Sequence, residues 1–171
     1  SGISRTFQNI RLFKDLSVWQ NIWVALQQDS DQSSGWMQEW FGNSKLQKEK
    51  IKEILVFSGL GSRFNDLAGN LSFGEQRRLE LARAIASKPK LILLDEPAAG
   101  MNSDEVADLR QRILDLKKLG LTVLLVEHVM ELVMNVVDRI VVLNFGKKIA
   151  EGSPENIQNN EDVQKAYLGG T

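Results

Sequence analysis

The chain has 171 residues, 43% of them hydrophobic and 25% charged, which is typical of one globular domain. Its net charge is −1, from 21 basic and 22 acidic residues, and no Lys/Arg-rich run indicates binding to nucleic acid. The absence of cysteine excludes disulfides and thiolate sites, and no apolar run approaches the roughly 20 residues of a membrane-spanning helix, so any membrane role is expected to need a partner.

The first predicted element is a short strand over residues 1–8, which ends in the polar Gln8. On its own, such a residue is most simply a polar strand end. Residues 16–28 are predicted to form an amphipathic helix, because Ser17 is a suitable N-cap and apolar residues recur on one face behind it.

A polar stretch then leads into an aromatic segment, residues 35–41 (GWMQEWF). Two interpretations stay open for this segment: it packs against its own subdomain, or it is a docking surface for a partner. A second helix is predicted over residues 45–57, ended by the glycines that follow. Its expected inward residues are Leu46, Ile51, Ile54 and Leu55.

The segment LSFGEQ, residues 71–76, predicts a helix start. Ser72 followed three residues later by Glu75 is the pattern of a capping box. The helix should end before Pro89, and its expected buried stripe is Leu79, Ala82, Ile85 and Ala86. Gly74 disfavours helix in the first turn, so we expect it to leave backbone N–H groups open to an anion.

Four aliphatic residues, 91–94, predict a strand buried on both faces of a parallel sheet. The strand ends in Asp95-Glu96-Pro97, and open α/β sheets bind ligands at the carboxyl ends of their strands. Two adjacent acids can divide the tasks of binding Mg²⁺ and orienting an attacking water. A solvated strand end is the simpler reading of an isolated Asp-Glu pair.

The remaining elements alternate in the same way. A helix capped by residues 103–105 is predicted to run to residue 119. It is followed by a buried strand over residues 121–126 that ends in Glu127 and His128, the only histidine. The next predicted elements are a helix over 129–137, a strand over 138–144, a hairpin turn, and two short terminal helices. This alternation predicts an α/β fold with a mainly parallel sheet.

LSFGEQ, a helix and LILLDEP in this order resemble the signature and Walker B motifs of the ATP-binding cassette (ABC) family. The resemblance implies a P-loop NTPase-like ATPase core with a helical signature subdomain. It assigns residues 1–11 to a core strand and Q-loop, 12–88 to the helical subdomain, and 89–171 to the core and tail. The start, the segment DEPAAGMN and the tail are similar to ATP-binding subunits of branched-chain amino acid importers, and a related branch serves lipopolysaccharide export.

The resemblance also implies a role for each matching residue. Glu96 would be the catalytic base or orient water, and Asp95 would bind Mg²⁺. Gln8, the Q-loop glutamine, would touch Mg²⁺ or the water, and His128 would contact the terminal phosphate of ATP. Five residues of the signature and one of the family's D-loop, Asn102, would contact the phosphates of an ATP molecule bound by a second cassette. The signature residues are Ser72, Phe73, Gly74, Glu75 and Gln76. The family more commonly has Asp where Asn102 stands, which puts a charge-based role there in doubt.

The implied partners are a second cassette, identical or different, and transmembrane permease subunits, at the cytoplasmic face of a bacterial or archaeal plasma membrane. No G-x-x-x-x-G-K-[ST] phosphate-binding loop occurs in the chain. We therefore expect this chain to be a fragment of an ATPase and to be inactive alone. We also expect the sheet to lack a strand beside residues 91–94, so that the sheet has a gap there or exchanges a strand with a neighbouring copy. The alternatives are a structural remnant that binds no nucleotide, and a soluble ABC protein of translation or DNA repair.

Overall fold

The computed structural model describes residues 2–6, 10–27 and 44–167. These residues form two compact units, Ser1–Glu127 and His128–Thr171. The predicted Gln8 and the aromatic segment 35–41 lie outside the described residues. Within the described parts of the chain, no helix is both long and apolar enough to cross a membrane.

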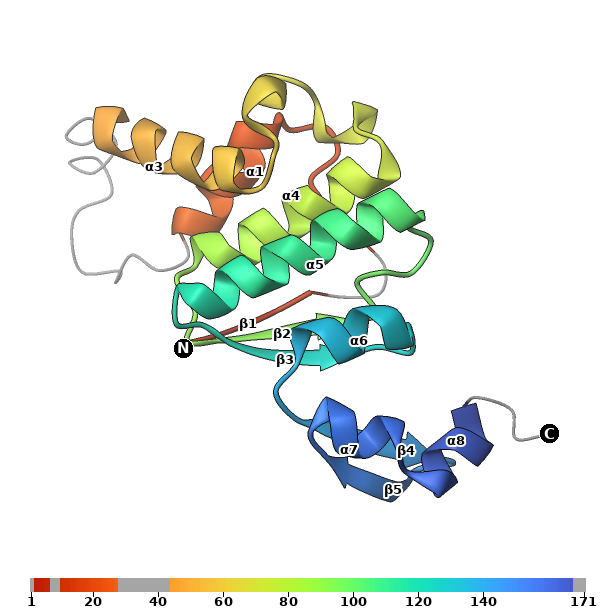
Figure 1. Ribbon diagram of the computed structural model, residues 1–171. Coiled ribbons are helices and arrows are strands. Elements are labelled where there is room, and N and C mark those ends of the chain that lie inside the picture. The colour runs from red at the N-terminus through yellow and green to blue at the C-terminus, as the bar shows by residue number, and fades with distance from the viewer. Residues whose placement is uncertain (1, 7–9, 28–43, 168–171) are drawn as a thin grey trace. The chain divides into compact units, whose positions relative to one another are not determined.

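The first unit contains a parallel sheet of three strands, β1 (Ile3–Arg5), β2 (Leu91–Asp95) and β3 (Thr122–Val126). The order is β1-β2-β3, so β2 pairs with β1 along one edge and with β3 along the other (Figure 1). This confirms the predicted α/β fold with a parallel sheet. The prediction of a gap beside residues 91–94 is wrong, because both edges of β2 have partner strands.

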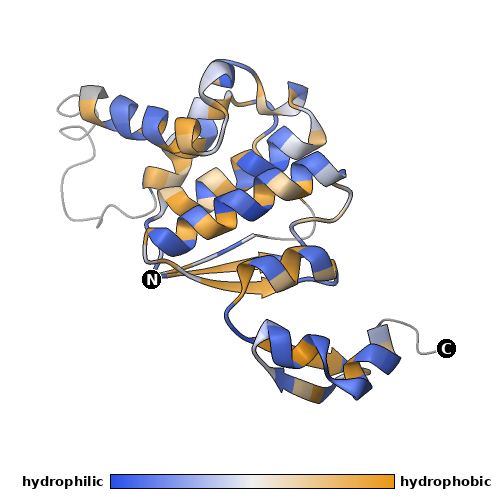
Figure 2. Ribbon diagram, in the orientation of Figure 1, coloured by the Kyte–Doolittle hydropathy of each residue, from blue (hydrophilic) through white to orange (hydrophobic). Residues whose placement is uncertain are grey.

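Helices α4 (Phe73–Ala86) and α5 (Ser103–Lys118) cover one face of this sheet (Figure 1). Burial along β2 alternates, with Ile92 and Leu94 fully buried and their neighbours half-buried. On β3, Leu124 and Val126 are more than half exposed. The prediction that residues 91–94 are buried on both faces therefore holds fully for one face only. The prediction of a buried strand over residues 121–126 is wrong for Leu124 and Val126. Both strands are hydrophobic along nearly their whole length, as Figure 2 shows, which is why their sequences predict more burial than the structure has.

A helical layer is formed by α1 (Val18–Gln27), α3 (Ser44–Phe57) and α4, with two 3₁₀ turns, η1 (Gly61–Arg63) and η2 (Ala68–Asn70). Ser17 caps α1 as predicted, since its Oγ accepts from the backbone N–H of Gln20 at 3.4 Å. The buried core of this layer comprises Val18, Ile22, Ala25, Ile51, Leu55, Leu60, Ala68, Leu71, Leu79, Ala82 and Ala86. Three residues expected inside differ: Leu46 is exposed, and Ile54 and Ile85 are only partly buried.

The second unit contains helix α6 (Met130–Val136) and an antiparallel hairpin of β4 (Ile140–Asn144) and β5 (Lys147–Gly152), followed by α7 (Pro154–Gln158) and α8 (Glu161–Tyr167). Phe145 and Gly146 both have positive φ, 45° and 75°, as a two-residue type I′ turn requires. Val142, Ile157 and Val163 form one buried cluster of this unit, between the hairpin and the two helices that follow it. The short helices therefore pack against the hairpin.

Candidate active site

The candidate site is organised around Asp95 and Glu96, which follow the buried part of β2. Asp95 ends the strand, and its Oδ2 accepts from Arg5 Nη2 at 3.0 Å, so the neighbouring strand β1 supplies its counter-charge. Glu96 has φ = 44°, a left-handed conformation that costs a non-glycine residue about 1–2 kcal/mol. Strained residues of this kind cluster at functional sites, because the surrounding structure must hold them.

The loop after Glu96 is held by β3. The Glu96 N–H donates to the carbonyl of Val126 at 2.9 Å. The Ala98 N–H donates to Oε1 of Glu127 at 2.8 Å, and Glu127 directly follows β3. Glu127 thereby fixes the loop that carries Glu96. From the sequence, Glu127 is recognisable only as a strand end, because nothing local indicates that it reaches across to the loop after β2.

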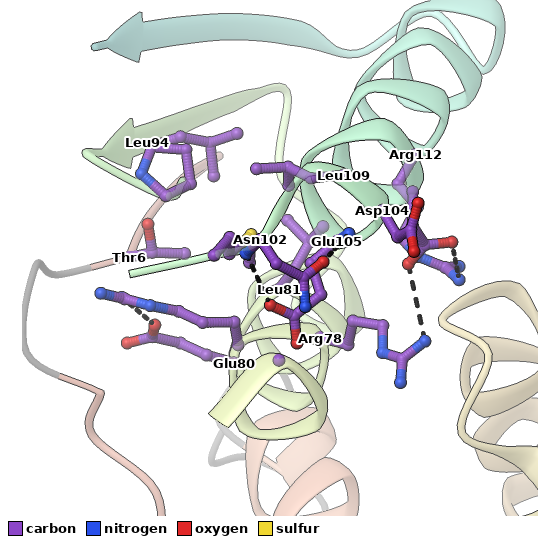
Figure 3. A pocket seen from close by; sticks show the side chains of 15 residues that line it. Thr6, Arg78, Glu80, Leu81, Leu94, Asn102, Asp104, Glu105, Leu109 and Arg112 are labelled. Carbon is purple, nitrogen blue, oxygen red and sulfur yellow. Dashed lines mark hydrogen bonds and ion pairs between the residues drawn. The ribbon is translucent and has the colours of Figure 1, made fainter. Parts of the chain in front are cut away.

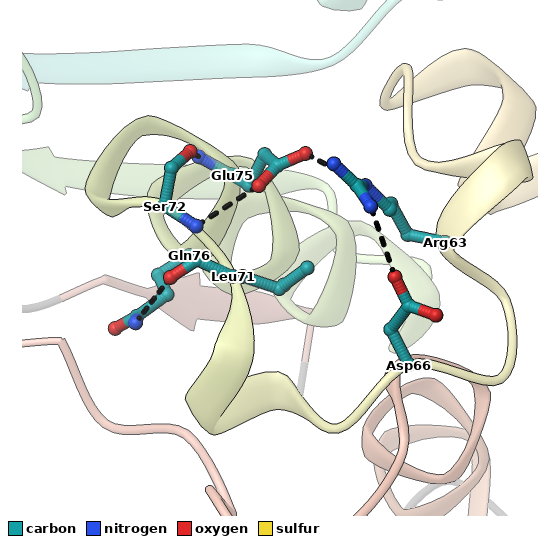
Figure 4. A network of polar contacts seen from close by, with 6 residues as sticks. All are labelled: Arg63, Asp66, Leu71, Ser72, Glu75 and Gln76. Atoms are coloured by element: carbon teal, nitrogen blue, oxygen red, sulfur yellow. Dashed lines mark hydrogen bonds and ion pairs between the residues drawn. The ribbon is translucent and has the colours of Figure 1, made fainter.

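The signature turn at the start of α4 forms the predicted capping box (Figure 4). Ser72 Oγ accepts from the Glu75 N–H at 3.3 Å, and Glu75 Oε2 accepts from the Ser72 N–H at 2.9 Å. Glu75 Oε1 also accepts from Arg63 Nε at 3.0 Å. The Gln76 side chain turns back and donates to the carbonyl of Leu71 at 2.9 Å. The turn is thus ordered by its own side chains.

These contacts affect the ionisation of Glu75. The hydrogen bond from the Ser72 backbone N–H is the largest influence, and it lowers the pKa of the Glu75 carboxyl; the Ser72 hydroxyl and Arg63 act in the same direction. Burial opposes them but does not prevail. Glu75 therefore carries a negative charge at the positive end of the α4 dipole.

Packing against α5 explains why position 74 is a glycine, which the sequence alone did not show. A Cβ placed there would lie 2.2 Å from Oε1 of Glu105, so the carboxylate of α5 occupies the space of the missing side chain. Asn102 is the N-cap of α5, and its Oδ1 accepts from the Glu105 N–H at 3.0 Å. The predicted helix start at 103–105 is confirmed, with the cap itself at Asn102. The role of Gly74 toward an anion stays a prediction.

A cavity of about 380 Å³ lies between α4, α5 and the carboxyl end of β2 (Figure 3). Leu81, Leu94 and Leu109 form part of its apolar lining, while Arg77 and Glu80 of α4 contribute charge. Arg77 and Glu80 are both buried and form an ion pair at 3.3 Å. The sequence does not indicate that this pair is buried, because opposite charges three residues apart on a helix are common on exposed surfaces.

The segment after residue 9 is anchored to the same helix. Glu80 Oε1 accepts from the Arg11 N–H at 3.4 Å, and Arg83 donates to the Arg11 carbonyl. The Arg83 guanidinium also lies 4.9 Å from the centre of the Phe13 ring. Burial lowers the pKa of Arg83. The chain that follows the predicted Q-loop is therefore attached to the signature helix.

The structure brings Asp95, Glu96 and the signature-turn residues into one unit, together with Asn102. His128 is exposed and is the first residue of the second unit, so its role toward Glu96 stays a prediction, as does that of Gln8. Among the residues with described positions, no group of three or more His, Cys, Asp or Glu is placed to hold a metal alone.

A parallel α/β sheet with paired acids at a strand end and a capped, glycine-bearing helix start beside it defines a nucleotide-binding ATPase of the cassette type. The sequence model of the family described as ABC transporter matches residues 1–99. A second model, described as branched-chain amino acid ATP-binding cassette transporter, matches residues 147–171. The chain belongs to the ABC transporter family.

Curated relatives agree with this assignment. The chain is 41% identical to the high-affinity branched-chain amino acid transport ATP-binding protein BraF of Pseudomonas aeruginosa, over 98% of this chain and 68% of that protein. It is equally similar to LivG of Escherichia coli, a protein of the same description, with the same coverage. It is 35% identical to the lipopolysaccharide export system ATP-binding protein LptB of Haemophilus influenzae, over 98% of this chain and 66% of that protein.

Solved structures share the fold. The ADP conformation of an ATP-binding cassette of an ABC transporter superposes with a TM-score of 0.79 at 30% identity, covering 99% of this chain and 69% of the other. A nucleotide-free cassette from an ABC transporter gives 0.77 at 30% identity, over 99% and 69%. The predicted cassette fold is therefore confirmed.

Proposed function

We propose that this chain is the ATP-hydrolysing part of a branched-chain amino acid importer and that it works in a dimer of cassettes. The observation that carries the proposal is Glu96, an acid held in a strained backbone conformation directly after Asp95 at the end of β2. The match of residues 147–171 to the branched-chain amino acid model, and the higher identity to BraF and LivG than to LptB, favour import of these amino acids over lipopolysaccharide export.

The residues present suit a magnesium nucleotide. Mg²⁺ is held in proteins by one or two carboxylates together with the phosphates of the substrate, and Asp95 supplies such a carboxylate beside Glu96. ATP would supply the phosphoryl group that is transferred to water, with Mg²⁺ balancing its charge. Asp95 and Gln8 would hold the cation, Glu96 would orient or deprotonate the water, and His128 would donate to the terminal phosphate.

The signature turn would serve the nucleotide of a second cassette. Ser72 is exposed at the start of a 14-residue helix, where the N-terminal N–H groups and the helix dipole favour an anion. Together with Gly74 and Gln76, Ser72 would hold the phosphates of that nucleotide. Phe73, Glu75 and Asn102 complete the predicted set. Because one chain then contributes to the sites of two nucleotides, hydrolysis would require dimerisation. The movement that accompanies hydrolysis would be transmitted to membrane permease subunits.

The test is Glu96→Gln in the full-length protein. This change keeps the size of the side chain but removes the base, so we expect ATP hydrolysis to fall on the order of a hundredfold or more while ATP binding persists. ATP should then hold the variant as a dimer, which size-exclusion chromatography with light scattering would detect. Wild-type turnover by the variant would remove Glu96 from the mechanism.

A further inference from the structure

We propose that Phe73 and Glu105 are positioning residues that link the signature turn to the D-loop of the same chain, residues 98–102. Through this link, nucleotide bound at the signature would affect Glu96, which serves the other nucleotide of the dimer. The inference rests on the proposed ATPase function and adds a route between its two sites.

The first contact of the link joins Gly74 and Glu105. A Cβ at Gly74 would come within 2.2 Å of Oε1 and 2.9 Å of Cδ of Glu105, so the two segments touch without room for any side chain between them. The other carboxylate oxygen, Oε2, accepts from the Asn102 N–H at 3.0 Å. The Glu105 carboxylate therefore cannot move away from Gly74 without losing its bond to the Asn102 N–H, one of the two bonds of the capping box of α5 (Figure 3).

The second contact joins Phe73 and Gly100. A Cβ at Gly100 would lie 3.3 Å from Cε1 and 3.6 Å from Cζ of the Phe73 ring. Gly100 has φ = 77°, so the loop turns in a left-handed conformation directly against the ring. The Arg77 guanidinium lies 5.4 Å from the ring centre. Although it is 47% exposed, Phe73 is thus fixed on its own helix and pressed against the D-loop.

Two consecutive turns of the D-loop connect Gly100 to Glu96. The Met101 N–H donates to the Ala98 carbonyl at 3.1 Å, and the Ala99 N–H donates to the Glu96 carbonyl at 3.2 Å. Glu127 holds Ala98 from the other side. Between Gly100 and Glu96, Ala98 and Ala99 each form a backbone hydrogen bond within the turns, and Pro97 is buried. A displacement of Gly100 would therefore be transmitted toward Glu96. The strained φ of Glu96 makes this residue sensitive to such a displacement.

Phe73 was predicted to contact nucleotide, and the two roles differ in their kinetics. A residue that only binds ATP would raise the half-saturating ATP concentration when removed and leave kcat unchanged. A residue that links two sites would lower kcat and the Hill coefficient, because a misplaced Glu96 reacts slowly and the sites become independent. ATPase rates measured against ATP concentration separate these outcomes.

The experiment uses the full-length protein and two pairs of variants, with melting temperature as a check of folding. Phe73→Ala removes the ring and Phe73→Tyr retains it, while Glu105→Ala removes the carboxylate and Glu105→Gln retains its shape and cap. Phe145→Ala, at an almost fully exposed aromatic residue of the second unit, is the control for loss of a ring. Should Phe73→Ala fail to fold, Phe73→Leu takes its place with the same expectation.

We expect a wild-type Hill coefficient above one, and both alanine variants to lower it toward one with a fall in kcat on the order of tenfold. The Tyr and Gln variants and Phe145→Ala should behave as wild type. A wild-type Hill coefficient of one, or alanine variants with unchanged kcat and Hill coefficient, would overturn the link while leaving the ATPase function intact. A wild-type protein that does not hydrolyse ATP would instead overturn the proposed function, and this inference with it.

Discussion

Glu75 shows how a single side chain in the signature turn combines three tasks. Its carboxylate caps α4, accepts from Arg63, and places negative charge at the positive end of the helix. Each task stabilises the ionised form, which is why the pKa of this carboxyl is lowered. The charge therefore contributes to folding as well as to the local potential at the signature.

The pH dependence of this contribution follows from the direction of the shift. A carboxyl whose folded pKa is depressed stabilises the fold above its unfolded pKa, about 4.3, and loses that contribution as the pH falls through the lower folded value. Replacing Glu75 by Gln should cost about 1 kcal/mol at pH 7, and this difference should shrink as the pH falls below about 4. Urea unfolding at several pH values would measure it.

The control for this prediction is Glu53→Gln, which changes an exposed glutamate on α3. Its effect should stay within about 0.5 kcal/mol at pH 7. A Glu75→Gln difference that does not vary with pH would mean that shape alone, and not charge, sets the stability of the cap.

At the scale of elements, each of the three long helices α3, α4 and α5 is followed by a residue in the left-handed conformation, but the amino acid at this position differs. Gly59 ends α3 and Gly120 ends α5, each with the paired bonds of a Schellman motif, such as Leu60 N–H to the Leu55 carbonyl at 2.7 Å. Lys88 stands at this position after α4 with φ = 45°. The second bond of the motif cannot form there, because Pro89 has no N–H.

Lys88 therefore destabilises this helix end, and a substitution can remove the strain. Lys88→Gly should raise the free energy of unfolding by about 0.5–1 kcal/mol, since the left-handed strain of a lysine exceeds the entropy cost of a glycine. Gly120→Ala should lower it by about 1 kcal/mol through backbone strain alone, because a Cβ there would have no neighbour within 4 Å. Thermal and urea unfolding of both variants would check the two signs.

Gly59→Ala provides the comparison for steric contact. It should cost more than Gly120→Ala, because the new Cβ would lie 2.6 Å from Nη2 of Arg112. Equal losses at the two glycines would show that Arg112 moves aside freely, and a destabilised Lys88→Gly variant would contradict the strain argument.

At the scale of the molecule, sequence patterns predicted what is decided locally and missed what is decided by packing. The capping box at Ser72, the helix ends and the hairpin turn depend on residues within a few positions of one another. The exposure of Leu124 depends instead on which face of the sheet is covered, and four aliphatic residues in a row carry no information about that. The contacts Glu127–Ala98 and Gly74–Glu105 join residues about thirty apart, so no local pattern could indicate them.

The two units also differ in how much core they have. The helical layer of the first unit has a cluster of eleven buried core residues. In the second unit, the hairpin of β4 and β5 with α7 and α8, here called the hairpin unit, is packed around a cluster of three: Val142, Ile157 and Val163. Loss of one of these three should therefore open the hairpin unit without opening the rest, because stability within a protein is divided among local cooperative units. Val163→Ala should cost roughly 1–2 kcal/mol from lost methyl burial, which corresponds to about tenfold faster amide exchange.

Hydrogen exchange followed by mass spectrometry can locate this effect. Val163→Ala should speed exchange in peptides from β4, β5 and α8 and leave α4 at its wild-type rate. Val141→Ala is the matched control, since Val141 lies on the same hairpin but is half exposed, and it should change exchange little. If Val163→Ala instead accelerates exchange in α4 as much as in the hairpin, the two units unfold as one and the tail that matches the branched-chain amino acid model contributes to the stability of the whole cassette.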